Sequence, residues 1–187
     1  VGTMWECPDF FPLGDKHVLI CSPQNMKAEK YEFHNGNNSV YFLGNYDKNS
    51  HIFEKEQPHT IDYGLDFYAP QTTLLPDGRR VVIAWMKSWD ACVVPDTQDW
   101  QGMMTLPREL EVKDGQIWQQ PVRELVQYHK NPCHYEHAEI DGETALSGIC
   151  GRTMDLTITM DEQDFNVFSI QLAADEEYET SFTYHKG

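Results

Sequence analysis

Apolar and polar residues alternate with a period of two over most of this chain, and elsewhere the apolar residues form short runs. Gly, Pro, Asp and Asn bound these segments, which is typical of β-strands and turns. Asp-Gly dipeptides at residues 77–78 and 114–115 each stand between two such runs and predict hairpins. The pattern predicts an all-β fold, whose strands in the first two thirds of the chain are residues 17–22, 39–44, 67–75, 80–86, 104–112 and 116–122.

Part of this pattern repeats along the chain. Glu-Cys-Pro at residues 6–8, a turn at 14–15 and Val-Leu-Ile at 18–20 correspond to Tyr-Ala-Pro at 68–70, a turn at 76–78 and Val-Val-Ile at 81–83. The offset is 62 residues before the turn and 63 after it, which places one inserted residue in the second turn. Repeated strand–turn–strand units are typical of a β-propeller, and residues 1–122 are too few for a closed one. We therefore expect a partial β-propeller over residues 1–122.

The alternation stops after Pro121 and returns near Thr144. Residues 123–143 are irregular and rich in histidine and charge, which is typical of a linker. In residues 144–187, the segments 152–160, 165–172 and 180–184 alternate and predict strands with one buried face. These strands are too few for a complete β-sandwich, so we expect the start of such a domain there.

The net charge of the chain limits the classes of molecule that it is expected to bind. Its 187 residues include 14 Lys and Arg against 30 Asp and Glu, for a formal net charge of −16. So acidic a chain disfavours nucleic acids and anionic membranes as partners, and it has no apolar stretch of roughly 20 residues that would form a membrane helix. Five scattered cysteines without a Cys-x-x-Cys pair indicate reduced thiols and a cytoplasmic protein, although a secreted parent stays open. The exposed edges of a partial propeller would favour self-association.

The segment with the clearest candidate chemistry is Trp-Glu-Cys-Pro-Asp-Phe-Phe at residues 5–11. Apolar neighbours disfavour the ionised form of Glu6, which would raise its pKa and suit it to act as a general acid near neutral pH. The flanking aromatic residues suit the apolar face of a sugar ring. An ordinary strand glutamate that faces solvent fits the same residues, so the local pattern alone leaves both interpretations open.

This segment resembles the acid/base motif of the β-fructosidases, the glycoside hydrolase family 32 of invertases, levanases, inulinases and sucrose-6-phosphate hydrolases. Other motifs of that family are matched in the same order by Asp-Tyr-Gly-Leu-Asp-Phe-Tyr-Ala-Pro-Gln-Thr at residues 62–72, the strand at 80–86, Thr-Leu-Pro-Arg-Glu-Leu at 105–110 and Gln-Pro-Val at 120–122. The resemblance implies the later blades of a five-bladed β-propeller, followed by part of a C-terminal β-sandwich.

The resemblance also implies an activity. It gives Glu6 the role of general acid/base in the hydrolysis of a terminal β-fructofuranosidic bond with retention, for which sucrose or sucrose-6-phosphate is the first choice of substrate. It implies no metal and no organic cofactor. The nucleophile and the transition-state stabiliser of the family lie in Asn-Asp-Pro and Arg-Asp-Pro motifs upstream of the glutamate, and this chain contains neither motif. Because a retaining mechanism needs two carboxyl groups, we expect a fragment that is inactive alone.

Further residues are weaker candidates for contact with the substrate, and two of them, Asp62 and Tyr68, fall in the second segment that resembles the family. Asp62 and Tyr68 would line the pocket, with turn capping and core packing as their respective alternatives. Trp85 and Trp89 would stack on a sugar, although Trp85 fits the core equally well. Arg108 would form a salt bridge, either as part of the scaffold or with an acidic group of the pocket.

The sequence also offers candidate residues for binding a phosphate group or a metal ion, and it leaves two alternative functions open. Lys27, Lys30, Arg79 and Arg80 are the basic residues available to a phosphate group. The cluster His129, Cys133, His134 and His137 matches no zinc spacing and is expected to be a solvated part of the linker. The alternatives to a fructoside hydrolase are a non-catalytic carbohydrate-binding or interaction propeller and a related propeller glycosidase that acts on arabinan or xylan.

Overall fold

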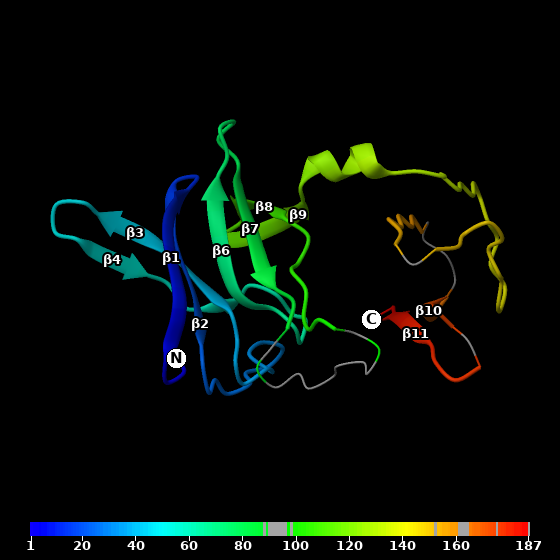
Figure 1. Cartoon of the computed structure of the whole chain (residues 1–187), viewed down its shortest axis with the longest axis horizontal. Helices are drawn as coiled ribbons and strands as arrows, with labels where there is room; N and C mark the ends of the chain where they lie inside the picture. Colours follow the sequence, from blue (N-terminus) through cyan, green and yellow to red (C-terminus); the bar gives the residue numbers. More distant parts are fainter. Residues whose placement is uncertain are drawn as a thin grey trace. The chain divides into compact units, whose positions relative to one another are not determined.

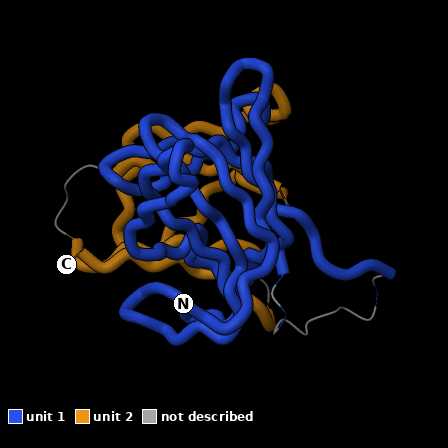
Figure 2. Tube along the Cα trace, turned by 90° about the vertical axis from the view of Figure 1, so that its left-hand side faces the viewer, with its two compact units in different colours: residues 1–125 blue, residues 126–187 orange. Residues whose placement is uncertain are grey.

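The computed structural model describes residues 1–87, 89, 97, 99–151, 153–160, 165–174 and 176–186 (Figure 1). Its regular elements are strands and one 3₁₀ helix, which confirms the all-β prediction. The chain divides into two compact units, Val1–Leu125 and Val126–Gly187 (Figure 2). Within the described ranges, we find no helix with the length and apolar character needed to span a membrane.

The first sheet of unit 1 is an antiparallel meander. Gly14 and Asp15 make the two-residue turn of its first hairpin, where Gly14 has a φ of +61° that favours glycine. The last two strands, of four and two residues, are too short to show an alternation and were not predicted. The strands are β1 (Trp5–Leu13), β2 (Lys16–Pro23), β3 (Val40–Asp47) and β4 (Ile52–Lys55), and β5 (His59–Thr60) pairs with β3 beside them.

The second sheet is also an antiparallel meander, with the strands β6 (Tyr68–Leu74), β7 (Arg80–Trp85), β8 (Arg108–Lys113) and β9 (Gln116–Pro121). Asp114 and Gly115 both have positive φ in the β8–β9 turn, as a tight hairpin of this kind requires. The strand predicted from residue 104 begins only at Arg108. Upstream of it, Met104 makes an isolated bridge to Trp85 rather than a continuous ladder.

The internal repeat is confirmed in the backbone. β1 has a register shift between Glu6 and Asp9, and β6 has one between Tyr68 and Gln71, 62 residues further on. Within each irregularity one residue has positive φ, +47° at Cys7 and +50° at the equivalent Ala69. The extra residue lies in the second turn, as predicted, because Leu74 pairs with Arg80 where Pro12 pairs with His17. The repeat therefore gives Glu6 and Tyr68 equivalent places on two hairpins.

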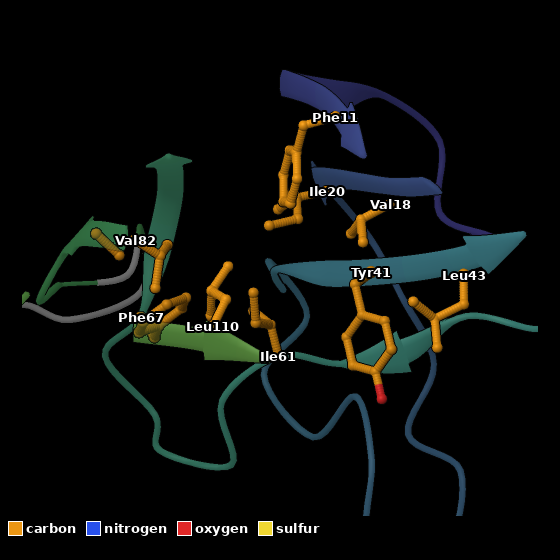
Figure 3. Packing of buried hydrophobic residues seen from close by; sticks show 10 residues of the cluster. Phe11, Val18, Ile20, Tyr41, Leu43, Ile61, Phe67, Val82 and Leu110 are labelled. Atoms are coloured by element: carbon orange, nitrogen blue, oxygen red, sulfur yellow. The ribbon is translucent and has the colours of Figure 1, made fainter. Parts of the chain in front are cut away.

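One cluster of buried side chains joins the two sheets (Figure 3). Val18 and Ile20 face it from alternate positions of β2, as the two-residue period of a strand requires. Val82 and Leu110 face it from the second sheet, and Phe67 from the connection between the sheets. Since these side chains are almost fully buried, their packing fixes the hairpin β1–β2 against the hairpin β6–β7.

The second unit has less regular structure. Its hairpin consists of β10 (Val167–Leu172) and β11 (Thr180–His185), close to two of the predicted strands. The strand predicted at 152–160 is wrong over its described residues 153–160, because no strand within the described part of the chain pairs with them. The segment predicted as irregular linker begins with the 3₁₀ helix η1 (Arg123–Tyr128).

Candidate active site

The structure brings Glu6 and Tyr68 together. Glu6 stands near the start of β1 and Tyr68 at the start of β6, and the Tyr68 hydroxyl donates a hydrogen bond to Glu6 Oε2 at 2.5 Å. The Tyr68 side chain is buried, whereas Glu6 is partly open to solvent. A buried, fixed donor therefore holds an accessible carboxylate in place.

The electrostatics of this pair differ from the expectation. Hydrogen bonds, first from the Tyr68 hydroxyl and then from the Gln24 side chain, lower the pKa of Glu6 below its ordinary value. The raised pKa predicted for Glu6 is wrong for this chain, because these hydrogen bonds outweigh its slight desolvation. Burial, with the bond to Glu6 second, raises the pKa of Tyr68 to about 12. At neutral pH Tyr68 is thus a permanent donor and Glu6 an ionised acceptor.

Aromatic side chains lie beside this carboxylate. Trp89 packs edge-on against Tyr68 and against Trp85, with ring centroids 6.2 Å apart in both pairs. Trp89 is 59% exposed, and Lys87 Nζ lies 5.8 Å from the centre of the Trp85 ring. Gly102 lies against the Trp85 indole so closely that a Cβ at this glycine would be 2.6 Å from Nε1. The two predicted tryptophans therefore form an accessible aromatic surface next to Glu6.

A pair of buried serines behind the site was missed by the sequence analysis. Ser22 Oγ accepts a hydrogen bond from Ala69 N at 3.2 Å and lies 3.1 Å from Ser39 Oγ, which donates to Phe67 O at 3.3 Å. The residues on both sides of Tyr68 are thereby held by one chain of hydroxyl groups. Small polar residues in strands give no signal of such a role, because the contacts join positions 28 and 47 residues apart.

Asp62 lies in different surroundings. Its Oδ1 accepts the Gly64 N–H at 2.7 Å, as in a capped turn, and its Oδ2 lies 2.6 Å from Arg108 Nη1. The pair borders a cavity of about 360 Å³ that Tyr41 and Gln119 also line. Among the described residues, no hydrogen bond or ion pair joins Asp62 to Glu6. The structure thus pairs Asp62 with Arg108 and brings Tyr68, Trp85 and Trp89 to Glu6.

Two of the four basic residues considered for a phosphate group are already engaged. Arg79 pairs with Asp77, Glu109 and Glu124, and Arg80 donates to Thr72 Oγ1 at 2.9 Å. Lys27 and Lys30 are exposed.

The histidine-rich segment of the second unit has separate partners. His129 pairs with Asp155, His134 pairs with Glu136, and the Cys133 thiol donates to Ser147 O. In the described part of the chain, no group of three or more His, Cys, Asp and Glu side chains is placed to hold a metal. The described cysteines Cys7, Cys21, Cys133 and Cys150 are free thiols, and Cys92 lies outside the described residues.

Comparison with known proteins points to one family. The model of the glycosyl hydrolases family 32 N-terminal domain matches residues 1–121. A raffinose invertase of Escherichia coli is 47% identical over 122 residues, which cover 65% of this chain and 26% of that protein. A sucrose-6-phosphate hydrolase of Salmonella typhimurium is 44% identical over 128 residues, which cover 67% of this chain and 28% of that protein.

Solved structures agree with these sequence matches. A GH32 β-fructofuranosidase of Bombyx mori superposes with a TM-score of 0.66 at 32% identity, over 70% of this chain and 28% of that one. A sucrose-6-phosphate hydrolase of Lactobacillus gasseri superposes with a TM-score of 0.64 at 29% identity, over 70% of this chain and 27% of that one. The chain thus spans little more than a quarter of the length of these relatives.

Proposed function

The chain belongs to glycosyl hydrolase family 32, and from this we propose that the protein hydrolyses terminal β-fructofuranosidic bonds with Glu6 as its general acid/base. Sucrose and sucrose-6-phosphate are the first substrates to consider, because the relatives bear the names raffinose invertase and sucrose-6-phosphate hydrolase. Because the chain spans little more than a quarter of those relatives, the activity is proposed for the longest form of the protein that its gene encodes.

The observation that carries this proposal is the hydrogen bond from Tyr68 to Glu6 Oε2. A general acid/base needs a fixed carboxyl group that a substrate can reach, and a buried donor beneath a partly exposed carboxylate meets that need. In the forward step Glu6 would give its proton to the glycosidic oxygen as the bond from that oxygen to the anomeric carbon breaks. The second carboxylate that retention requires forms a bond to the anomeric carbon in this step. Glu6 would then take a proton from the water that attacks this carbon and displaces that carboxylate.

The lowered pKa of Glu6 bears on the first of these steps. A general acid must hold a proton at the working pH, which the bond from Tyr68 opposes. Retention requires a second carboxylate about 5–5.5 Å away, and a like charge at that distance raises the pKa of its neighbour. In the proposed enzyme the negative charge of the nucleophile therefore raises the pKa of Glu6 and keeps it protonated. When the nucleophile loses that charge in the covalent intermediate, the pKa of Glu6 falls and Glu6 is ionised.

The aromatic surface beside Glu6 is suited to contact a sugar ring of the substrate. Trp89 and Trp85 present ring surface within reach of a sugar that is bound at Glu6, and the C–H faces of sugar rings pack on such surfaces. Of the four basic residues considered for a phosphate group, Arg79 is bound in ion pairs with acidic side chains, whereas Lys27 and Lys30 are exposed. Both the unphosphorylated and the phosphorylated fructoside are therefore tested.

The test compares initial rates of sugar release from sucrose, sucrose-6-phosphate and arabinan. We expect hydrolysis of at least one fructoside, no release from arabinan, and a loss of turnover in Glu6→Gln. Cleavage of arabinan alone would favour the arabinan-type glycosidase and overturn the proposal. Binding of fructosides without turnover would favour the carbohydrate-binding alternative and overturn it equally.

A further inference from the structure

Asp9, three residues after Glu6, makes contacts that the proposed chemistry does not use. Its Oδ2 accepts two hydrogen bonds from Thr72, one from the backbone N–H at 2.8 Å and one from the hydroxyl at 2.6 Å. The Thr72 hydroxyl oxygen in turn accepts from Arg80 Nη1 at 2.9 Å, and the Arg80 guanidinium lies 4.4 Å from the centre of the Phe11 ring. Two donors on one residue fix both the direction and the distance of the Asp9 side chain.

These contacts belong to a row that joins the two bulged strands. Tyr68 donates to Glu6 at 2.5 Å, Gln71 Nε2 donates to Cys7 O at 3.1 Å, and Thr72 donates to Asp9. β1 and β6 lie in different sheets, so no backbone ladder sets their position relative to each other here. Side chains therefore determine how the Glu6 end of β1 meets the Tyr68 end of β6.

The local backbone makes this support necessary. Cys7 has a φ of +47° between Glu6 and Asp9, a strained conformation that L residues keep only when their surroundings impose it. A bulge bends its strand and turns the side chains beside it. Asp9 is the first residue past the bulge that returns to the β1–β2 register, where it pairs with Ile20. An anchor at this position therefore sets the direction in which Glu6 leaves the strand.

We propose that Asp9 is a positioning residue for Glu6, which it keeps within hydrogen-bond distance of Tyr68 by anchoring the β1 bulge to Thr72. The role in turnover rests on the proposed function of Glu6, whereas the role in geometry does not. Thr72 holds the Asp9 side chain through Oδ2, and the proposed role of Asp9 is to fix the backbone of β1 rather than to contact the substrate.

The experiment uses Asp9→Ala and Thr72→Val, with Asp15→Asn as the control. Thr72→Val replaces the hydroxyl by a methyl group, which removes the bonds of that hydroxyl to Asp9 and from Arg80, and it keeps the backbone N–H and the branched shape. It therefore also tests the contact if Asp9→Ala does not fold. Asp15 lies exposed in the turn of the same hairpin. The first readout is the pKa of the Glu6 carboxyl in this chain, measured by carbon NMR. The second readout is kcat and KM for sucrose in the longest form that the gene encodes.

The sign of the pKa change separates positioning from simple electrostatics. Removal of the Asp9 charge alone would lower the pKa of Glu6, because a like charge disappears. Loss of the Tyr68 hydrogen bond, which is the largest cause of the lowered value, would raise it. We expect a raised pKa of Glu6 in Asp9→Ala, a smaller rise in Thr72→Val and no change in Asp15→Asn.

For turnover we expect kcat to fall by about 10- to 100-fold in Asp9→Ala with KM unchanged, since a small misplacement of a reacting group has such effects. A lowered or unchanged pKa of Glu6 in folded Asp9→Ala and Thr72→Val would overturn the proposal. If Glu6→Gln keeps full turnover while the pKa of Glu6 rises in Asp9→Ala, the proposed function fails and the positioning role stands.

Discussion

The two buried serines behind Tyr68 allow a quantitative prediction. Ser22 Oγ has one acceptor role, toward Ala69 N, and one donor role, toward Ser39 Oγ, whose own proton goes to Phe67 O. The direction of this chain follows from the donors and acceptors at its two ends. Ser22 is fully buried and Ser39 is 4% exposed, so the two hydroxyl groups are shielded from water.

The cost of Ser22→Ala follows from the groups left without a partner. The substitution leaves the Ala69 N–H without an acceptor, and an unsatisfied buried group costs about 1–3 kcal/mol. Ser39→Ala leaves the Phe67 carbonyl without its donor and the Ser22 hydroxyl without its acceptor, and it should lower the free energy of unfolding by a similar amount. Since both single variants lose the same hydroxyl–hydroxyl bond, the double variant should cost less than the sum by about 1 kcal/mol.

Urea unfolding of the chain, followed by tryptophan fluorescence, measures these costs. With a slope of about 2 kcal/mol/M, Ser22→Ala should lower the midpoint by roughly 0.5–1.5 M. Ser50→Ala is the matched control, because its hydroxyl bonds Asp47 at 2.7 Å in an exposed turn and should shift the midpoint little. Equal midpoints for Ser22→Ala and Ser50→Ala, or strictly additive effects of Ser22→Ala and Ser39→Ala, would refute the reasoning.

Two further predictions concern the ion pairs of β8 and the aromatic surface. The pKa of Glu109 is lowered from 4.5 to about 2, and the largest cause is the hydrogen bond from the Arg123 side chain, 2.6 Å away. The stability that this carboxylate contributes is therefore complete above pH 4.5 and is lost as the pH falls toward 2. The urea midpoint of Glu109→Gln should lie below wild type at pH 7 and converge with it near pH 2, and a pH-independent gap would contradict the assignment. Gly102→Ala should displace the Trp85 indole, which a Cβ would approach to 2.6 Å, and so raise KM and change the tryptophan emission. An unchanged KM together with an unchanged emission would show that Trp85 does not depend on this glycine.

The sequence was informative wherever the signal is local. Alternating positions and short apolar runs between turn residues predicted β2, β3, β6, β7 and β9, because both patterns are typical of strands. The internal repeat correctly predicted two equivalent hairpins, since the bulges at Glu6 and Tyr68 recur with the same 62-residue offset as the repeated sequence. The alternation at 153–160 failed because pairing with a neighbour, and not alternation, makes a strand.

Contacts between distant residues were beyond the sequence pattern. The predicted pKa of Glu6 had the wrong sign because the donor that decides it, Tyr68, lies 62 residues away. The contacts of Asp62 depend on Arg108, 46 residues away, and those of Asp9 on Thr72, 63 residues away. The repeat offset of 62 residues relates Glu6 to Tyr68 but does not say that the two side chains meet, so these contacts emerge only from the packing of one hairpin against the next.

The most direct test of the central claim, that Glu6 supplies the proton to the leaving group, compares two fructosides in Glu6→Ala. With sucrose the departing sugar oxygen needs that proton, and the rate should fall by about 10²–10⁴-fold. With a nitrophenyl β-fructofuranoside the departing nitrophenolate needs none, so the first equivalent should be released at a rate close to wild type. Equal losses on both substrates, or an undiminished rate on sucrose, would contradict the assignment of Glu6 as the acid.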